Sequence, residues 1–157
     1  NIPYVGFLFL GLIRVEDTPY VIEYNVRMGD PETQVVLPRI KNDLAEMLYA
    51  TAVGKLDAVK LLVEKKSATT VVAVSGGYPE AYEKGKIING LPSSTNSTVF
   101  QAGTTNNEGE ILTNGGRVIA VTSLGGDHKK ALKKSYKLLE KISFEGMYFR
   151  KDIGFDL

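Results

Sequence analysis

The sequence contains no cysteine among its 157 residues. This absence excludes a disulfide framework, a thiolate zinc site and a cysteine nucleophile. Neither sign of charge is in excess, because 19 basic and 18 acidic residues give a formal net charge of +1. Composition therefore gives no reason to expect nucleic acid or a membrane surface as a partner. The lack of disulfides fits a reducing compartment, and we expect a cytoplasmic location.

The sequence also has no long hydrophobic run. The longest early apolar stretch covers residues 5–13 and is interrupted by Gly6 and Gly11. A membrane helix needs about 20 apolar residues, and no basic segment precedes this stretch. We therefore expect a buried strand here. The chain begins with Asn1 rather than methionine, which suggests a fragment of a longer protein.

The first 28 residues predict a β-hairpin. Residues 4–15 are apolar, residues 16–19 form a turn signal, and residues 20–28 alternate between polar and apolar side chains. Side chains on a strand alternate between its faces, so one face of the second strand carries Val21, Glu23, Asn25 and Arg27. A plain surface strand would show the same pattern, and this alternative stays open at this point.

A helix start is expected directly after this polar strand face. Asp30 suits the N-cap, Pro31 the first helical position, and Glu32 the positive end of the helix dipole. Such junctions are common places for ligand sites. Further helices are expected from residue 42 or 43 to about 54, and over residues 56–64.

The polar face itself suits a hard cation. Magnesium takes oxygen ligands, usually one or two from protein and the rest from phosphates and water. Glu23 and Asn25 offer a carboxylate and an amide oxygen two residues apart. Arg27 suits a phosphate or carboxylate, which a guanidinium binds with two parallel hydrogen bonds.

The rest of the chain predicts a β-rich unit with one helix. Strands are expected over residues 68–74, 98–103, 111–113 and 117–124, with a surface loop over 92–98 and a hairpin connection over 104–109. Asp127 should cap a helix that reaches about residue 142. Its inward residues should be Ala131, Leu132, Leu138, Leu139 and Ile142, and its lysine-rich face should be solvated.

Two glycine-containing segments admit both a structural and a phosphate-binding interpretation. Gly115 and Gly116 would let a ligand approach the backbone, and Arg117 beside them could hold a phosphate. A β-turn with a surface arginine explains the same residues. For Ser75-Gly76-Gly77-Tyr78-Pro79 a structural turn is favoured, because the segment lacks the P-loop pattern. The single histidine, His128, is interpreted as a solvated residue. Core positions are expected for four aromatic residues near the end of the chain: Phe144, Tyr148, Phe149 and Phe155.

Residues 27–34, Arg-Met-Gly-Asp-Pro-Glu-Thr-Gln, are long and specific enough to compare with known families. Together with residues 23–26 they resemble the signature of the glycinamide ribonucleotide synthetase (phosphoribosylamine–glycine ligase) family. The similarity continues over residues 4–8, 75–79, 82–85, 99–104, 113–118 and 144–154, and so covers essentially the whole chain. The family often has histidine where this chain has Gln101, which argues against an essential proton transfer there.

The resemblance implies an α+β structure with two parts. Residues 1–64 would be the C-terminal portion of an ATP-grasp domain, and residues 65–157 a small C-terminal β-rich domain with a flanking helix. Glu23 and Asn25 fall on the family's magnesium (or manganese) ligands, and Arg27 would act catalytically beside the transferring phosphate. Gly29, Asp30 and Glu32 would line the substrate side. Arg117 would bind the 5-phosphate of phosphoribosylamine.

The activity implied is an ATP-dependent carbon–nitrogen ligation in purine biosynthesis. Glycine and phosphoribosylamine would give glycinamide ribonucleotide, ADP and phosphate by way of glycyl phosphate. The isolated chain is expected to be inactive, because the rest of the ATP-grasp domain and the family's N-terminal domain are not found in it. Two alternatives remain at this point: a non-catalytic module that binds phosphoribosyl ligands, and a fragment of a related ATP-grasp carboxylase.

Overall fold

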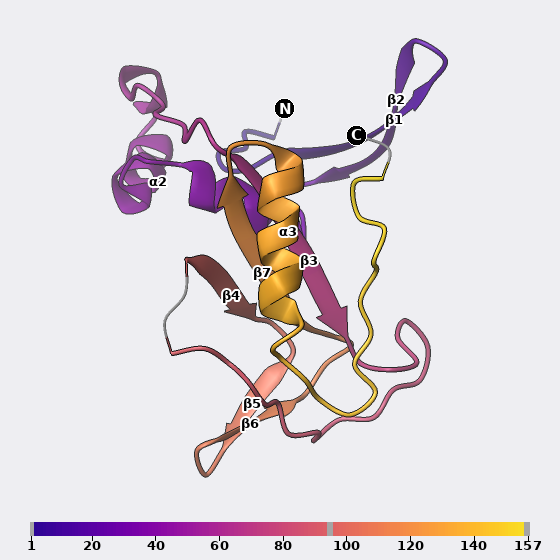
Figure 1. Cartoon of the computed structure of the whole chain (residues 1–157). Coiled ribbons are helices and arrows are strands. Elements are labelled where there is room, and N and C mark those ends of the chain that lie inside the picture. The colour runs from indigo at the N-terminus through magenta and orange to yellow at the C-terminus, as the bar shows by residue number, and fades with distance from the viewer. Residues whose placement is uncertain (1, 94–95, 156–157) are drawn as a thin grey trace. The chain divides into compact units, whose positions relative to one another are not determined.

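The computed structural model describes residues 2–93 and 96–155. The chain divides into two compact units, Asn1–Glu64 and Lys65–Leu157, which are coloured indigo to magenta and magenta to yellow in Figure 1. Within the described residues the fold is mixed α+β, with small antiparallel sheets and three α-helices. No helix in this described part is long and apolar enough to cross a membrane.

Unit 1 contains the predicted hairpin. Strand β1, Phe9–Val15, pairs antiparallel with β2, Thr18–Asn25, around a turn at Glu16 and Asp17. Glu16 has φ 55°, which lets the turn close tightly. Both strands are shorter than predicted, because β1 begins only at Phe9 and β2 already ends at Asn25.

The pairing of β1 with β2 contains a bulge. Leu12 pairs with Val21, but the next residue, Gly11, pairs with Glu23. Strand β2 therefore holds one extra residue, Ile22, at this point. Strict alternation predicted that Val21 and Glu23 share a face. Because the bulge lies between them and breaks the alternation, the two side chains lie on different faces.

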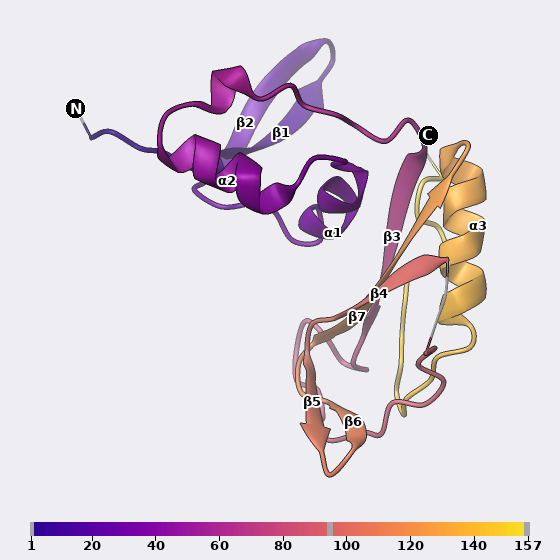
Figure 2. The same ribbon diagram turned by 90° about the vertical axis from the view of Figure 1, so that its left-hand side faces the viewer.

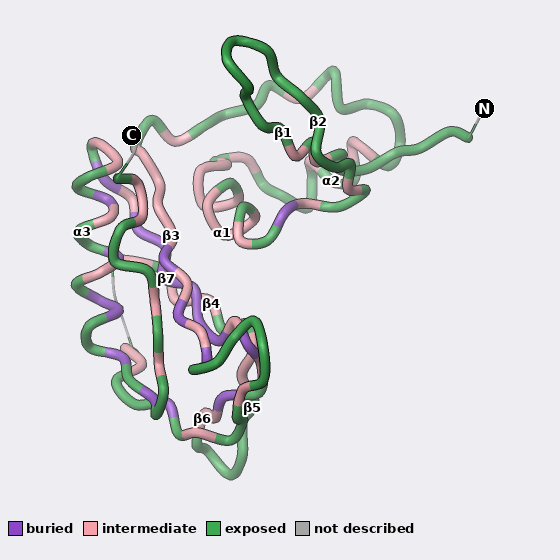
Figure 3. The backbone as a smooth tube through the Cα atoms, turned by 90° about the vertical axis from the view of Figure 1, so that its right-hand side faces the viewer, coloured by how far each residue is buried: buried purple, intermediate pink, exposed green. Residues whose placement is uncertain are grey.

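The prediction of a buried strand is wrong for β1 in this structure. Leu10 and Leu12 are 45% and 54% exposed, and most of the hairpin is drawn as exposed in Figure 3. The sheet of unit 1 has only the two described strands. Such a sheet has no covering layer of its own, so its apolar side chains stay open to solvent.

The helices of unit 1 are short. Helix α1 covers Thr33–Val36 and continues into a 3₁₀ turn, Leu37–Arg39. Helix α2, Leu44–Ala52, begins as predicted at Asp43, whose carboxylate accepts a 3.0 Å hydrogen bond from the backbone nitrogen of Glu46. The helix predicted over residues 56–64 is wrong: a single 3₁₀ turn, Leu56–Ala58, is followed by extended chain that forms a bridge between Val63 and Ile40.

Unit 2 has a three-stranded sheet with its longest strand in the middle. Strand β7, Arg117–Gly125, lies between β3, Ser67–Val74, and β4, Ser97–Gln101, and both pairings are antiparallel. Helix α3, His128–Leu139, lies along one face of this sheet (Figure 2). The core gathers between the helix and the sheet, and its fully buried members include Val71, Val118, Ile119, Val121, Leu139 and Ile142.

Helix α3 begins as predicted. The Asp127 carboxylate accepts a 2.7 Å hydrogen bond from the backbone nitrogen of Lys130. Ala131, Leu138 and Leu139 are buried, and Leu132 is half-buried against the core. The helix ends at Leu139 rather than near residue 142, although Ile142 is still buried in the core.

The predicted strand pairing of residues 98–113 is wrong. Strand β4 pairs with β7 rather than with residues 111–113. The predicted connection contains a further strand, β5, Thr104–Asn107, which pairs with β6, Glu110–Thr113. A turn with positive φ at Glu108 and Gly109 joins the two strands tightly enough for pairing to start directly beside it. Strand β4 also starts within the predicted surface loop, of which residues 94 and 95 lie outside the described residues.

Candidate functional site

Glu23 and Asn25 share one face of β2, as the sequence predicts. Between them the register is regular, with Gly11 opposite Glu23 and Phe9 opposite Asn25. Both residues lie on the C-terminal side of the bulge, in the part of β2 that leads toward Gly29 and the turn at residues 30–32. An uninterrupted two-residue step therefore places a carboxylate and an amide side by side at the end of the strand.

The Glu23 side chain is not used to hold the fold together. It is exposed and forms no hydrogen bond or ion pair with any described residue. Its aliphatic part lies across the hairpin over Gly11, because a β-carbon placed on Gly11 would stand 2.8 Å from Cγ of Glu23. The carboxylate thus keeps its acceptor positions for a ligand.

The amide of Asn25 is similarly uncommitted. Its Nδ2 atom is buried yet has no hydrogen-bond partner among the described residues. Most buried polar atoms in proteins are paired, so an unpaired one at a strand end marks a candidate ligand site. A carboxylate and an amide oxygen are suitable donors for magnesium or manganese. The described residues contain no group of three His, Cys, Asp or Glu residues that could hold a metal ion.

Arg27 is not on the same strand face, contrary to the prediction from strict alternation. Strand β2 ends at Asn25, and Arg27 lies in the bend that follows. Its side chain is exposed, and Nη1 donates a 3.0 Å hydrogen bond to the carbonyl oxygen of the neighbouring Met28. This single local bond leaves further guanidinium donors for an anion.

Gly29 is buried and closely surrounded. A β-carbon there would stand 2.9 Å from Cδ of Glu32 and 3.1 Å from Cε2 of Phe9. The Glu32 carboxylate therefore lies against the backbone of Gly29. Since Phe9 is also the partner of Asn25 across the hairpin, its ring joins the end of β2 to this turn.

The predicted capping role of Asp30 is wrong. Helix α1 begins at Thr33, so the residue before it is Glu32, which makes no capping hydrogen bond with its side chain. Residues 30–32 form a turn, with a cis peptide bond between Asp30 and Pro31. Asp30 lies two positions before the N-cap position, Glu32, and its Oδ1 accepts a 3.0 Å hydrogen bond from Nε2 of Gln34 instead.

Gly115, Gly116 and Arg117 lie in unit 2, apart from the residues of unit 1 described above. Arg117 is the half-buried first residue of β7. The carbonyl oxygens of both glycines accept hydrogen bonds from Ser75, at 2.9 Å from its hydroxyl and 2.8 Å from its backbone nitrogen. A β-carbon on Gly115 would stand 2.9 Å from Cα of Gly103. The glycines thus allow three segments to meet, which supports the structural interpretation of this pair and of the turn after Ser75.

A charged cluster in unit 2 was not anticipated from the sequence. Nζ of Lys86 lies 2.7 Å from Oε2 of Glu83 and 3.1 Å from Oε2 of Glu145, beside a small cavity of about 110 Å³. The hydrogen bond from Lys86, and then its charge, hold the pKa of the Glu83 carboxyl below its ordinary value of 4.5. Hydrogen bonds to Glu83 and Glu145 raise the pKa of Lys86. Only the Glu83–Lys86 pair has a spacing, i to i+3, that the sequence could have revealed.

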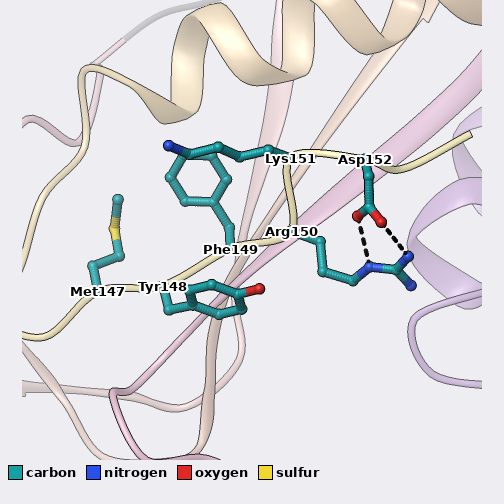
Figure 4. Close-up of a pocket in the computed structure, with 6 residues that line it drawn as sticks. All are labelled: Met147, Tyr148, Phe149, Arg150, Lys151 and Asp152. Carbon is teal, nitrogen blue, oxygen red and sulfur yellow. Dashed lines mark hydrogen bonds and ion pairs between the residues drawn. The ribbon is translucent and has the colours of Figure 1, made fainter. Parts of the chain in front are cut away.

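The C-terminal segment lines a shallow hollow of about 750 Å³ (Figure 4). In it the Arg150 guanidinium donates two 2.9 Å hydrogen bonds to the Asp152 carboxylate. This pairing lowers the pKa of Asp152, and it means that the Arg150 guanidinium is already paired with a carboxylate.

The prediction that the aromatic residues of the C-terminal segment belong to the core is confirmed for Phe144 and Phe149. It is wrong for Tyr148 and Phe155, which are 60% and 76% exposed.

Comparison with known families gives two matches along this chain. Residues 68–156 match the C domain of phosphoribosylglycinamide synthetase, and residues 1–33 match the ATP-grasp (A) domain of the same synthetase. The second match contains Glu23, Asn25, Arg27, Gly29, Asp30 and Glu32.

Individual proteins agree with these matches. The chain is 47% identical over 98% of its length to the phosphoribosylamine–glycine ligase of Caldanaerobacter subterraneus subsp. tengcongensis, and 50% identical over 97% to a bifunctional purine biosynthetic protein of Dictyostelium discoideum. It spans 37% of the first relative and 20% of the second.

Solved structures give the same result. The crystal structure of the phosphoribosylamine–glycine ligase of Thermotoga maritima is similar with a TM-score of 0.75 and 39% identity, over 92% of this chain and 36% of that one. The urea carboxylase of Kluyveromyces lactis is similar over 85% of this chain and 12% of that one, with a TM-score of 0.58, but at 16% identity it shows the fold alone. The chain therefore belongs to the phosphoribosylglycinamide synthetase family.

Proposed function

We propose that these 157 residues are the C-terminal part of a phosphoribosylamine–glycine ligase. The complete enzyme would join glycine to 5-phosphoribosylamine with cleavage of ATP, a step of purine biosynthesis, and we propose a cytoplasmic location for it. The observation that carries the proposal is the pair Glu23 and Asn25 on one strand face, followed directly by the specific segment 27–34. The similarity to phosphoribosylamine–glycine ligases over nearly the whole chain supports it.

The two units would correspond to two parts of that enzyme. We assign residues 1–64 to the end of the ATP-grasp domain and residues 65–157 to the C-terminal β-rich domain. The division of the chain into Asn1–Glu64 and Lys65–Leu157 is compatible with this assignment, as are the two family matches.

Glu23 and Asn25 would be the protein ligands of a magnesium or manganese ion. Their fit rests on the uncommitted carboxylate of Glu23 and on the Asn25 side chain, which forms no hydrogen bond with the described residues and whose amide oxygen could coordinate such an ion. When bound, the cation would supply charge neutralisation for the β- and γ-phosphates of ATP. Two protein ligands leave its other positions to phosphate oxygens and water, which is how magnesium is usually held.

Arg27 would act on the transferring phosphoryl group. Its exposed guanidinium is held by one hydrogen bond to the Met28 carbonyl, and it could bind phosphate oxygens with its remaining donors. Gly29, Asp30 and Glu32 would line the substrate side of the same turn. Arg117 would bind the 5-phosphate of phosphoribosylamine, which makes its role one of binding rather than of phosphoryl transfer.

The reaction itself would need little covalent chemistry from these side chains. The carboxylate of glycine attacks the γ-phosphate and gives glycyl phosphate and ADP. The amine of phosphoribosylamine then attacks the acyl carbon and displaces phosphate. Reactions of this kind depend mainly on positioning and on neutralising negative charge, which agrees with a site made of one carboxylate, one amide and one arginine.

The isolated chain should not turn over. It spans 37% of its bacterial relative, and the exposed apolar face of β1 and β2 would be covered by the rest of the ATP-grasp domain. The expected partners are therefore ATP, glycine, phosphoribosylamine and the N-terminal remainder of the same enzyme.

The test is reconstitution from two pieces. This chain is mixed with a separately produced N-terminal remainder, and ADP release is measured with magnesium, glycine and freshly generated phosphoribosylamine. Activity should require both pieces and glycine. Glu23→Ala should lower the rate on the order of 10²-fold or more, as for other electrostatic stabilisers. Asp17→Ala is the matched control, because this carboxylate lies on the same hairpin, is exposed and pairs with the surface residue Arg14.

Three outcomes would contradict parts of the proposal. A wild-type rate for Glu23→Ala at saturating magnesium would remove the metal assignment. Activity without glycine would favour the carboxylase alternative. A folded complex of the two pieces that binds a phosphoribosyl ligand without ATP and shows no ligation would favour the non-catalytic binding module.

A further inference from the structure

We propose that Gly11 is a positioning residue for the Glu23 carboxylate. Gly11 is neither a predicted ligand nor part of the segment 27–34, and it acts from the opposite strand of the hairpin. The inference rests on the proposed role of Glu23 as a metal ligand, and it adds a second residue on which that ligand's geometry depends.

The first argument is the space that Gly11 leaves. It stands directly opposite Glu23, and a β-carbon on it would come within 2.8 Å of Cγ of Glu23 and 3.6 Å of its Oε1. Carbon atoms that are not bonded pack at about 3.5 to 4.0 Å, so the β-carbon of any side chain at position 11 would overlap the Cγ methylene group of Glu23. Only glycine allows Glu23 to lie across the hairpin as it does.

The second argument concerns the backbone. Gly11 lies inside β1 and does not have the left-handed conformation that favours glycine at several turns of this chain. A glycine inside a strand weakens the strand, and such glycines often mark places where another group approaches closely. The group that approaches here is the side chain of Glu23, so the reason for glycine is room rather than conformation.

The third argument is the bulge. Starting at the turn, the pairing is regular from Val15 opposite Thr18 to Leu12 opposite Val21. If it continued in the same register, Gly11 would stand opposite Ile22. The extra residue shifts the register, so that Gly11 meets Glu23 instead. Bulges commonly re-aim a side chain next to an active site. Here the bulge brings together the glycine and the one carboxylate of β2.

An alanine at position 11 would force Glu23 into another side-chain conformation. The obstruction is at Cγ, close to the backbone, and the rotation about χ1 that is needed to move Cγ also swings the carboxylate away. The fold of the hairpin would survive, because alanine is compatible with a strand. The expected defect is therefore a weaker metal site rather than an unfolded one.

The experiment uses the complete ligase and Mn²⁺ as the probe. The free Mn²⁺ concentration that gives half of the maximal rate is measured at saturating ATP, and Mn²⁺ binding is followed separately by electron paramagnetic resonance. Gly11→Ala is compared with Glu23→Gln, with the double variant and with Gly126→Ala. Gly126 is the matched control, because no atom lies within 4 Å of the place of its β-carbon and its backbone is not left-handed.

Gly11→Ala should raise the half-saturating Mn²⁺ concentration about 10-fold or more, the range for residues that orient a metal ligand. Gly126→Ala should leave it unchanged, and Gly11→Ala should add nothing in the Glu23→Gln background. A smaller fraction of folded enzyme would lower the maximal rate but would not move this concentration, so misfolding cannot imitate the result.

Two other results would overturn the inference. If Glu23→Gln weakens Mn²⁺ binding but Gly11→Ala does not, or if Gly11→Ala acts equally in both backgrounds, Gly11 has no positioning role and the proposed metal site stands. If Glu23→Gln itself binds Mn²⁺ as the wild type does, the metal assignment fails and the role of Gly11 fails with it.

Discussion

The ring of Tyr78 lies against the backbone of Gly116, where a β-carbon would stand 2.6 Å from Cε2 and 3.1 Å from Cγ of the ring. Gly116 is buried, and its carbonyl oxygen accepts the backbone hydrogen bond of Ser75. The glycine therefore has a structural reason that involves no ligand. It holds the turn after β3 against the start of β7, and this separates its role from that of the adjacent Arg117.

Gly116→Ala should destabilise unit 2. The added methyl group would overlap the Tyr78 ring, and overpacking of this kind typically costs about 1 to 3 kcal/mol. The measurement is urea-induced unfolding of the chain, and Gly126→Ala in open space is the control. In a Tyr78→Ala background the effect of Gly116→Ala should largely vanish, because the obstructing ring is gone. An equal loss in both backgrounds would show that Tyr78 is not the cause.

Arg117→Gln should affect one substrate only. If Arg117 binds the 5-phosphate, its loss in the complete ligase removes charge-assisted hydrogen bonds worth about 1.5 to 3 kcal/mol, which corresponds to a rise in KM for phosphoribosylamine of roughly 10- to 150-fold. KM for ATP and for glycine should stay unchanged. Equal changes in all three constants, or none, would leave Arg117 with a purely structural role at the start of β7.

Local signals account for the parts of the fold that could be predicted from the sequence. The apolar runs of β3 and β7 and the capping residues Asp43 and Asp127 all depend on neighbours within a few positions. The pair Glu23 and Asn25 could be found for the same reason, since a two-residue step on a regular stretch of strand needs no tertiary information.

The contact of Gly11 with Glu23 could not be predicted in this way. A turn at Glu16 and Asp17 together with regular pairing places Gly11 opposite Ile22, and nothing in the order of residues marks the extra one. Asp30 failed as a cap for a similar reason: the segment suits a helix start, but the chain makes a turn there and the helix begins only at Thr33. The prediction that β1 is buried was wrong because an apolar composition does not show which layer, if any, covers a strand.

The pH dependence of stability should reveal the capping role of Asp127. The backbone hydrogen bond from Lys130, and then its side-chain hydrogen bond, hold the pKa of the Asp127 carboxyl below its ordinary value of 3.8. A lowered pKa in the folded state means that the stabilisation is present above the ordinary value and is lost as the pH falls through the folded pKa. Wild-type chain should therefore unfold at more urea than Asp127→Asn at about pH 7, and the difference should shrink toward about pH 3.

Asparagine is the informative replacement, because it caps helices about as well as aspartate but carries no charge. Asp127→Ala, which also removes the acceptor, should be less stable than Asp127→Asn at neutral pH. A difference between wild type and Asp127→Asn that is constant with pH would show that the charge of Asp127 does not contribute to the stability of helix α3.

Hydrogen exchange should divide the isolated chain according to burial. Strand β7 is buried along most of its length beneath α3, whereas β1 and β2 form a two-stranded sheet with exposed side chains (Figure 3). Isolated two-stranded hairpins are marginally stable, so the amides of β1 and β2 should exchange on the order of 100-fold faster than those of β7. Addition of the N-terminal remainder of the ligase should slow exchange in β1 and β2 and leave β7 unchanged, because the proposed assembly covers the hairpin. Hairpin amides that are as protected as β7 in the chain alone would contradict the prediction, and hairpin amides that stay fast in a proven complex would show that the remainder does not cover the hairpin.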